Sequence, residues 1–291
     1  MAGMKTGKIC SIALASLALA SCSRAPSEDP LVVLDRAAAK AQSLDSAAFD
    51  IDFSYSSSEP PLAVSGTAEG VMAHAGRQLS LSFRGNMRLP DEGPDKTVSV
   101  AGNFIVADTG DAYLRIQRAD GSILMLPGVG LIPDTMLDTW YSFESPSSGA
   151  EAVSPDPSYL AMQTSSLSVV RDRGIDRIDG YDCYRYDVTI DREKLLTFLE
   201  RTASEKHEQF DRASAETFLK THDADGKVWI DVETSVIRRI EWQFSSVDGA
   251  PAMDASFALH LQKHGETVEI SPPSNAIPFS EAQSSIQLPA L

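Results

Sequence analysis

The sequence predicts an α+β fold: a half-open, unclosed antiparallel β-barrel of about ten to eleven strands with helices on its concave side. Three observations lead to this. Apolar and polar residues alternate along many segments, such as FDIDFSY at 49–55 and LSLSF at 79–83, which is the pattern of a strand with one buried face. Short glycine-containing links at 109–111, 120–121, 248–249 and 264–265 separate such runs, as in antiparallel hairpins. Helical patterns are confined to the start of the chain and to one insert.

The two helical regions have different patterns. PLVVLDRAAAKAQSLDS, at 30–46, begins with a proline and carries apolar residues near helical spacing, so it predicts one amphipathic helix. The insert at about 191–223 predicts two helices, broken near Ala203 and Ser204. An antiparallel sheet of this width must curl. We expect the two helical segments to pack against the concave side of the curled sheet.

The N-terminus predicts an export signal. Lys5 and Lys8 precede an uncharged apolar run that is shorter than the roughly 20 residues needed to span a bilayer, as in a secretory signal peptide. The run ends in Leu19-Ala20-Ser21-Cys22, which resembles the bacterial lipobox. We therefore expect a signal peptide at 1–21, a lipidated tether at 22–30 and lipidation of Cys22. A plain signal peptide that happens to contain a cysteine is the alternative.

The charge restricts the partners. The formal net charge of the 291-residue chain is −16, and removal of residues 1–21, which carry two lysines and no acids, makes it −18. A surface this acidic argues against nucleic acid as a partner and against electrostatic docking on an anionic membrane. The lipid on Cys22 would therefore provide the membrane anchor, and at least two acyl chains are needed for a stable one.

One domain is expected between the tether and the C-terminus. It spans 31–279 and includes the insert, and 280–291 are expected to form a flexible tail. Within this domain Cys183 has no cysteine to pair with once Cys22 is acylated. We expect it to be a small buried hydrophobic residue, with a reactive thiol as the alternative.

The C-terminal half resembles a known family. IDGYDCYRYDVTID, a helical insert, GKVWIDVETSVIRRIEWQF and SFALHLQKHGETVEISPPSNA are similar to the corresponding part of LppX/LprG-type lipoproteins of the LolA-like superfamily. The matching positions are Gly180, Tyr184, Tyr186, Trp229, Asp231, Pro272 and Pro273. The resemblance implies an unclosed barrel with a hydrophobic cavity covered by helices. It also implies a ligand that is a lipid, a glycolipid or an acyl chain, although one relative of this fold is a sensor.

The sequence shows no catalytic or metal-binding constellation. There is no G-x-S-x-G motif and no glycine-rich phosphate loop. His260 and His264 lie four residues apart in a strand-to-turn region, which separates them by about 13 Å along a strand. Residues 222–226, HDADG, lack the acids that a calcium loop needs at its first and twelfth positions. We expect no enzyme activity, no cofactor and no metal.

The candidate ligand cavity is the inward face of the curled sheet. Residues two apart on one strand share a face, so Tyr184 and Tyr186 point the same way, as do Trp242 and Phe244. The candidates are Phe53, Phe83, Phe104, Leu114, Tyr184, Tyr186, Trp242 and Phe244. A packed core would use the same residues, and the pattern alone does not separate the two readings.

These observations give one main functional expectation and two alternatives. We expect a cell-envelope lipoprotein that binds a lipid or acylated ligand, as a carrier, with the membrane reached through Cys22. The first alternative is a non-catalytic interaction or sensory module of the same fold, with a filled core and an envelope protein partner. The second is an envelope hydrolase whose site is not visible in the sequence.

Overall fold

The structure is a computed structural model. It describes residues 28–59, 61–88, 97–120, 124–126, 130–132, 136–143, 160–161, 164–205, 209–247 and 249–285. The expected signal peptide, Cys22 and most of the tether lie outside these residues. The helices are α1 (Pro30–Gln42), α3 (Arg192–Glu205), α4 (Arg212–Thr221) and α5 (Phe279–Ser285).

Twelve strands form one sheet. In chain order they are β1 (Ala47–Ser58), β2 (Pro61–Ala73), β3 (Gln78–Arg88), β4 (Thr97–Val106), β5 (Ala112–Asp120), β8 (Tyr141–Phe143), β9 (Leu167–Ile178), β10 (Tyr181–Ile190), β11 (His222–Asp231), β12 (Ile237–Ser246), β13 (Met253–Gln262) and β14 (Ile277–Pro278). Their spatial order is β14-β8-β5-β4-β3-β2-β1-β13-β12-β11-β10-β9. Strands β6 (Leu124–Leu126) and β7 (Gly130–Ile132) form a separate pair.

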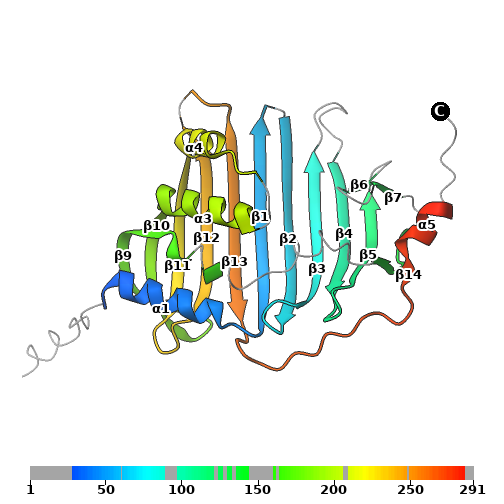
Figure 1. Cartoon of the computed structure of the whole chain (residues 1–291), viewed down its shortest axis with the longest axis horizontal. Helices are drawn as coiled ribbons and strands as arrows, with labels where there is room; N and C mark the ends of the chain where they lie inside the picture. Colours follow the sequence, from blue (N-terminus) through cyan, green and yellow to red (C-terminus); the bar gives the residue numbers. More distant parts are fainter. Residues whose placement is uncertain are drawn as a thin grey trace, which may run out of the picture.

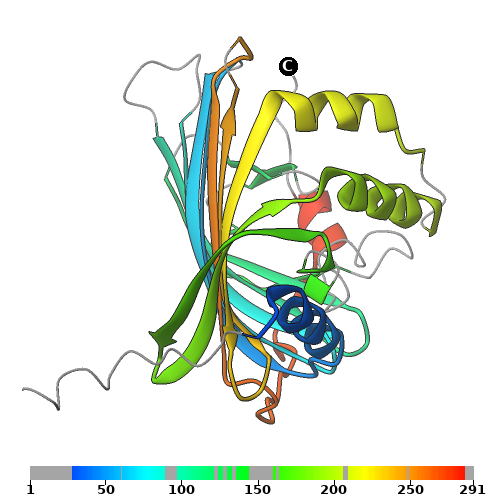
Figure 2. The same cartoon turned by 90° about the vertical axis from the view of Figure 1, so that its left-hand side faces the viewer.

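The predicted fold class is confirmed, with one more strand than expected. The sheet is antiparallel throughout except for the short parallel pair β14 and β8, and it does not close on itself. Helices α1, α3 and α4 lie on one side of the curved sheet (Figures 1 and 2). The C-terminal half of the chain returns beside its start, because β13 pairs with β1.

Three boundaries differ from the sequence prediction. Helix α1 ends at Gln42 rather than near 46, because Ala47 already belongs to β1, whose residues pair from there on. The insert breaks after Glu205, and Asp211 caps α4 by accepting a hydrogen bond from the Ser214 amide. Residues 280–285 of the expected flexible tail belong to helix α5 (Phe279–Ser285). Phe279 anchors it, with its ring centroid 4.7 Å from that of Phe143.

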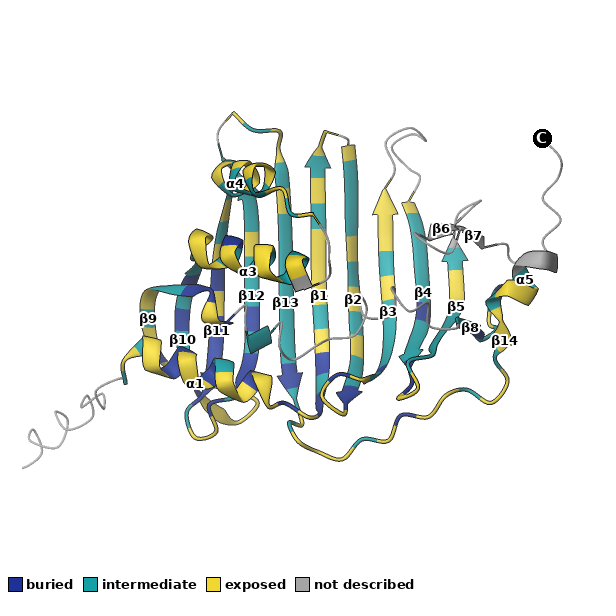
Figure 3. Cartoon of the chain, in the orientation of Figure 1, coloured by how far each residue is buried: buried dark blue, intermediate teal, exposed yellow. Residues whose placement is uncertain are grey.

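The core lies at the end of the sheet where α1 crosses it. Asp29 caps α1, and Pro30 occupies its first turn, where the missing amide proton is not needed. The helix buries Val33, Leu34, Ala37 and Ala41 against inward residues of β10, β11 and β12. Figure 3 shows the buried residues gathered at this end of β11, β12, β13 and β1, while the other end is mostly half-buried or exposed.

Candidate functional site

The strand register makes one continuous inward face. Residues directly opposite each other on antiparallel strands point to the same side. The row through Ile51 runs to Leu259 and Ile240 on one side, and to Ala68 and Phe83 on the other. All eight residues proposed from the sequence lie on this face: Phe53, Phe83, Phe104, Leu114, Tyr184, Tyr186, Trp242 and Phe244.

This inward face carries no formal charge over most of its width. At the described inward positions of β1–β5 and β11–β13 there is no Asp, Glu, Lys or Arg. The outward face holds the polar pairs instead, such as Asn103 between Ser82 and Arg115. The sheet therefore separates an apolar concave side from a polar convex side.

Much of the inward face is filled. Tyr186 is wholly buried beside α1, and Tyr184 and Trp242 pack partly buried against the same cluster. Phe104 packs against a second cluster around Phe49 and Leu261. Phe83 and Leu114 pack against a third around Ile116, Met136 and Tyr141. For these six proposed residues the structure shows packing within the protein.

The remaining inward residues form a patch at the end of the sheet away from α1. We call it the inner apolar surface and define it as Phe53, Tyr55, Val64, Met87, Phe244 and Phe257. The members are neighbours through the register, and none belongs to a core cluster of the described residues. Phe53 and Met87 are each 39% exposed, unusually open for large apolar side chains on a concave face.

Three aromatic rings at or beside this surface pack closely against glycines. Phe53 is directly opposite Gly66, Phe83 opposite Gly102, and Trp242 opposite Gly226. A Cβ added to the glycine would come within 2.7 Å of the ring of Phe53, 2.9 Å of Phe83 and 2.7 Å of Trp242. Glycine in a strand interior marks a place where another group approaches closely. At Gly226 that group is the Trp242 ring, whereas at Gly66 and Gly102 a backbone carbonyl oxygen, of Arg84 and Arg115 respectively, approaches as well as the ring.

The sequence analysis missed several members of this site. Tyr55, Val64, Met87 and Phe257 were not among its proposed residues, and neither were the three glycines. The glycines themselves were the available signal, because a strand interior has few reasons to hold one. Which aromatic residue lies over each glycine depends on the register, which only the structure supplies.

Helix α4, beside this surface, is held weakly. None of the ten residues of α4 is buried, and Phe218 is 50% exposed, stacked on His222 at 4.2 Å between ring centroids. Arg212 joins α4 to α3 through exposed ion pairs with Glu193 and Glu200, and it also pairs with Glu216 within α4. Exposed pairs of this kind contribute about 0–1 kcal/mol each.

Tyr186 carries a buried hydroxyl with no hydrogen-bond partner among the described residues. Burial raises the pKa of this phenol above its usual value. A buried polar group without a partner is destabilising by about 1–3 kcal/mol. We therefore expect Tyr186→Phe to raise the free energy of unfolding by about 1 kcal/mol, measured by urea denaturation. A loss of stability would mean that the hydroxyl has a partner in solution.

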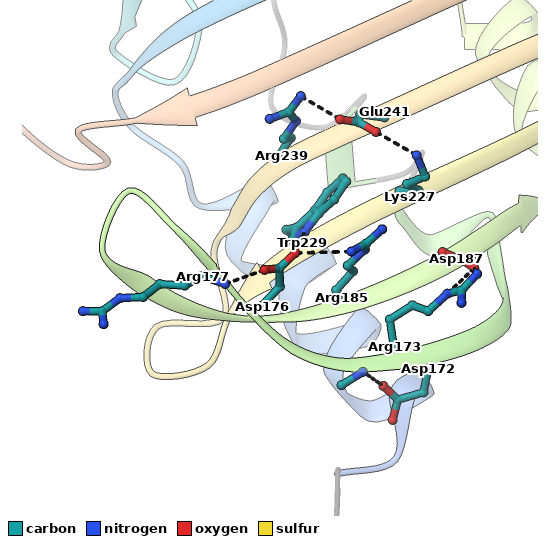
Figure 4. A network of polar contacts seen from close by, with 11 residues as sticks. Asp172, Arg173, Asp176, Arg177, Arg185, Asp187, Lys227, Trp229, Arg239 and Glu241 are labelled. Atoms are coloured by element: carbon teal, nitrogen blue, oxygen red, sulfur yellow. Dashed lines mark hydrogen bonds and ion pairs between the residues drawn. The ribbon is translucent and has the colours of Figure 1, made fainter.

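The convex side holds a polar groove of about 510 Å³. Four of its charged side chains form two pairs: Arg173 donates to Asp187 at 2.6 Å, and the Lys227 ammonium lies 3.2 Å from Glu241. Figure 4 shows this network, which continues to Trp229 through Asp176. Because the charges within each pair neutralise each other, they attract a charged ligand only weakly. The groove is therefore a weaker candidate site than the concave face.

No catalytic or metal centre is apparent in the part of the chain that the structure describes. It contains no group of three or more His, Cys, Asp or Glu residues placed to hold a metal ion. His260 pairs with Asp179 at 2.6 Å, whereas His264 lies against Arg238 and the Ile237 carbonyl. Cys183 is fully buried, and burial raises the pKa of its thiol to about 11, so it is a core residue rather than a nucleophile.

Comparison with known proteins finds similar solved structures, but no matching family model or curated protein. No family model and no curated protein matches the chain. The lipoprotein LppX of Mycobacterium tuberculosis matches over 84% of this chain and 100% of its own, with 15% identity and a TM-score of 0.41. LprF of Mycobacterium bovis matches over 84% and 96%, with 15% identity and a TM-score of 0.43. Lipoproteins of the LppX/LprG type, to which the sequence was expected to be similar, are found among these solved structures.

A third solved structure, the MucA/MucB complex of Pseudomonas aeruginosa, is similar over 82% of this chain and 58% of its own, with 15% identity and a TM-score of 0.26. Among the described residues no helix is long and apolar enough to cross a membrane.

Proposed function

We propose that this protein is a cell-envelope lipoprotein, anchored through Cys22, that binds a lipid or acylated ligand on its inner apolar surface and carries it without catalysis. The observation that supports this best is the exposure of Phe53 and Met87 within an uncharged concave face. A filled core would bury such residues. On the outward face, which contacts water, neighbouring strands carry hydrogen-bonded polar side chains. The apolar character is therefore specific to the inward face.

An acyl chain suits this surface physically. Each buried CH₂ contributes about 0.8 kcal/mol, so a chain of ordinary length gains enough to bind tightly. The rings of Phe53 and Trp242, packed against Gly66 and Gly226, provide an apolar floor beside Phe257. A charged headgroup would remain outside this floor, because no charged residue stands at the described inward positions of the central strands.

Two adjacent residues of β1 offer a matched test. Phe53 points to the inner apolar surface, whereas Ser54 points to the convex face and contacts Ser256 at 2.7 Å. We expect Phe53→Asp to abolish saturable binding of a fluorescent fatty acid, because the ligand would have to desolvate a carboxylate. Ser54→Asp introduces the same charge on the other face and should bind as the unaltered protein does.

Equal binding by both variants would contradict a ligand site on the concave face. If neither the unaltered protein nor the Ser54 variant takes up the fatty acid, the carrier reading fails. The concave face would then be assigned to the alternative function, a protein partner with an apolar segment.

A further inference from the structure

The most exposed large apolar side chains lie on one edge of the molecule. Among the described residues, Val170 and Ile175 on β9 and Leu31 on α1 rank highest, at 66%, 59% and 57% exposed. Strand β9 is the last strand of the sheet, and α1 contacts it. Figure 2 views the molecule from this side, with β9 and the start of α1 toward the reader. We call this region the β9 edge and define it as Leu31, Val32, Val170, Arg171, Ile175 and Arg177.

Two arginines accompany these apolar residues. Arg171 and Arg177 are exposed, and within the described ranges neither has a carboxylate at ion-pair distance. The acids of β9 are engaged locally instead. Asp172 accepts a hydrogen bond from the Gly174 amide, and Asp176 accepts from Trp229 and Arg185 (Figure 4). Arg177 Nε donates to the Gly180 carbonyl at 3.2 Å, which leaves its positive charge unneutralised. In a chain of net charge −16, arginines without a carboxylate partner beside exposed apolar side chains are a local exception.

The β9 edge is poorly suited to pairing with a strand of a second protein. The register of β9 against β10 skips Arg173 and Val170, because Tyr186 pairs with Asp172 and Val188 with Val169. Each skipped residue is a bulge, and bulges on an edge strand disrupt the regular row of hydrogen-bonding groups that strand addition needs.

A membrane surface needs no such row. Apolar side chains enter the boundary of the acyl region, and arginines extend their charge to the lipid phosphates. The position of the anchor in the sequence also favours this edge. Cys22 lies eight residues before Pro30, which begins α1 beside the β9 edge. Eight residues reach at most about 28 Å, which keeps this edge near a bilayer that holds a lipid on Cys22.

We propose that the β9 edge lies against the membrane in which the protein is anchored, with Val170 and Ile175 in the interface and Arg171 and Arg177 on lipid phosphates. This rests on the Cys22 anchor of the proposed function. It fixes the orientation of the molecule, because the opposite end of the sheet, at β14 and β8, then points away from the bilayer.

The test uses the full lipidated chain, purified from its host and reconstituted into phosphatidylcholine–phosphatidylglycerol liposomes. Single cysteines replace Val170, Ile175 or, as a control at the opposite edge, Ile277, which is 41% exposed. Each is labelled with an environment-sensitive fluorophore. Cys183 stays unlabelled because it is fully buried. Liposome flotation, with and without Cys22→Ser, reports the anchor separately.

We expect labels at 170 and 175 to shift to the blue and to be quenched by spin-labelled lipids, and the label at 277 to remain unaffected. Floating protein with equal signals at all three positions would overturn the proposed orientation while leaving the anchor intact. Protein that floats equally well with serine at position 22 would overturn the Cys22 anchor, and protein that does not float at all would overturn both. Energy transfer between labelled copies without lipid quenching would assign the edge to a second copy of the chain and overturn the membrane assignment.

Discussion

Replacing Asp231 by alanine is expected to lower the free energy of unfolding by about 3–5 kcal/mol, because it leaves a buried charge without its partner. Asp231 is 3% exposed and Arg238 is 7% exposed. One carboxylate oxygen accepts from Arg238 Nη2 at 2.9 Å, and the other accepts from the amides of Glu233 and Thr234 in the β11–β12 turn. The same change therefore removes an ion pair and a turn-closing acceptor.

The neighbours of Arg238 explain why it cannot relax into water. Its guanidinium lies 3.7 Å from the centre of the Tyr181 ring and 3.2 Å from His264 Nδ1. Burial, followed by the positive charge of Arg238, lowers the pKa of His264. Burial alone would raise the pKa of Asp231, but hydrogen bonds from Thr234 and Arg238 bring it below its ordinary value. The carboxylate is thus held in its charged form for this arginine.

Asp223→Ala on the same strand is the matched control. Its carboxylate is 62% exposed and lies 3.6 Å from Arg192, so its loss should change stability by about 0–1 kcal/mol. The double variant Asp231→Ala with Arg238→Met should be more stable than Asp231→Ala alone, since no charge is left buried. Chemical denaturation measures all three variants. Equal losses for Asp231→Ala and Asp223→Ala would show that the buried pair is not formed.

Replacing Gly226 by alanine is expected to weaken binding of an apolar ligand about tenfold, which corresponds to about 1.4 kcal/mol. The three nearest atoms to the new Cβ, at 2.7–2.9 Å, all belong to the Trp242 ring. The ring must therefore lift from the sheet into the space beside Phe244 and Phe257. Forcing extra volume into a packed site also lowers stability by about 1–3 kcal/mol.

Gly85 supplies the control on the same face. A Cβ at this position would come no closer than 3.6 Å to other atoms, so Gly85→Ala leaves the neighbouring side chains in place. Titration of a fluorescent fatty acid should show unchanged affinity for this variant and reduced affinity for Gly226→Ala. Unchanged affinity in both would place the ligand away from the Trp242 side of the inner apolar surface.

The strands of the sheet were predictable from the sequence because alternation of apolar and polar residues is visible within each short segment. Residues such as Phe49, Ile51 and Phe53 alternate with polar neighbours, and this alternation alone assigns them to one face. The helical insert was likewise predictable from a pattern within its own segment. The end of the chain was not, because α5 depends on Phe279 packing against Phe143, a contact between residues more than a hundred positions apart.

For the candidate site, the sequence predicted which face of the sheet carries it but not which residues of that face are exposed. Alternation places Tyr186 and Phe53 on the same side of the sheet, yet Tyr186 is fully buried beside α1 and Phe53 is 39% exposed. The difference depends on where α1 crosses the strands, which the sequence does not specify. The close approach of Trp242 to the sheet depends on its register opposite Gly226, and register arises from the pairing of whole strands.

The central claim is that the concave face holds a lipid. Native mass spectrometry of the full chain, purified gently from its own host, tests it most directly when the same sample is extracted for lipids. The account predicts a reproducible additional mass of several hundred daltons beyond any modification of Cys22, recovered in the lipid extract and lost in the Phe53→Asp variant. An unloaded protein that also fails to take up added fatty acid would contradict it.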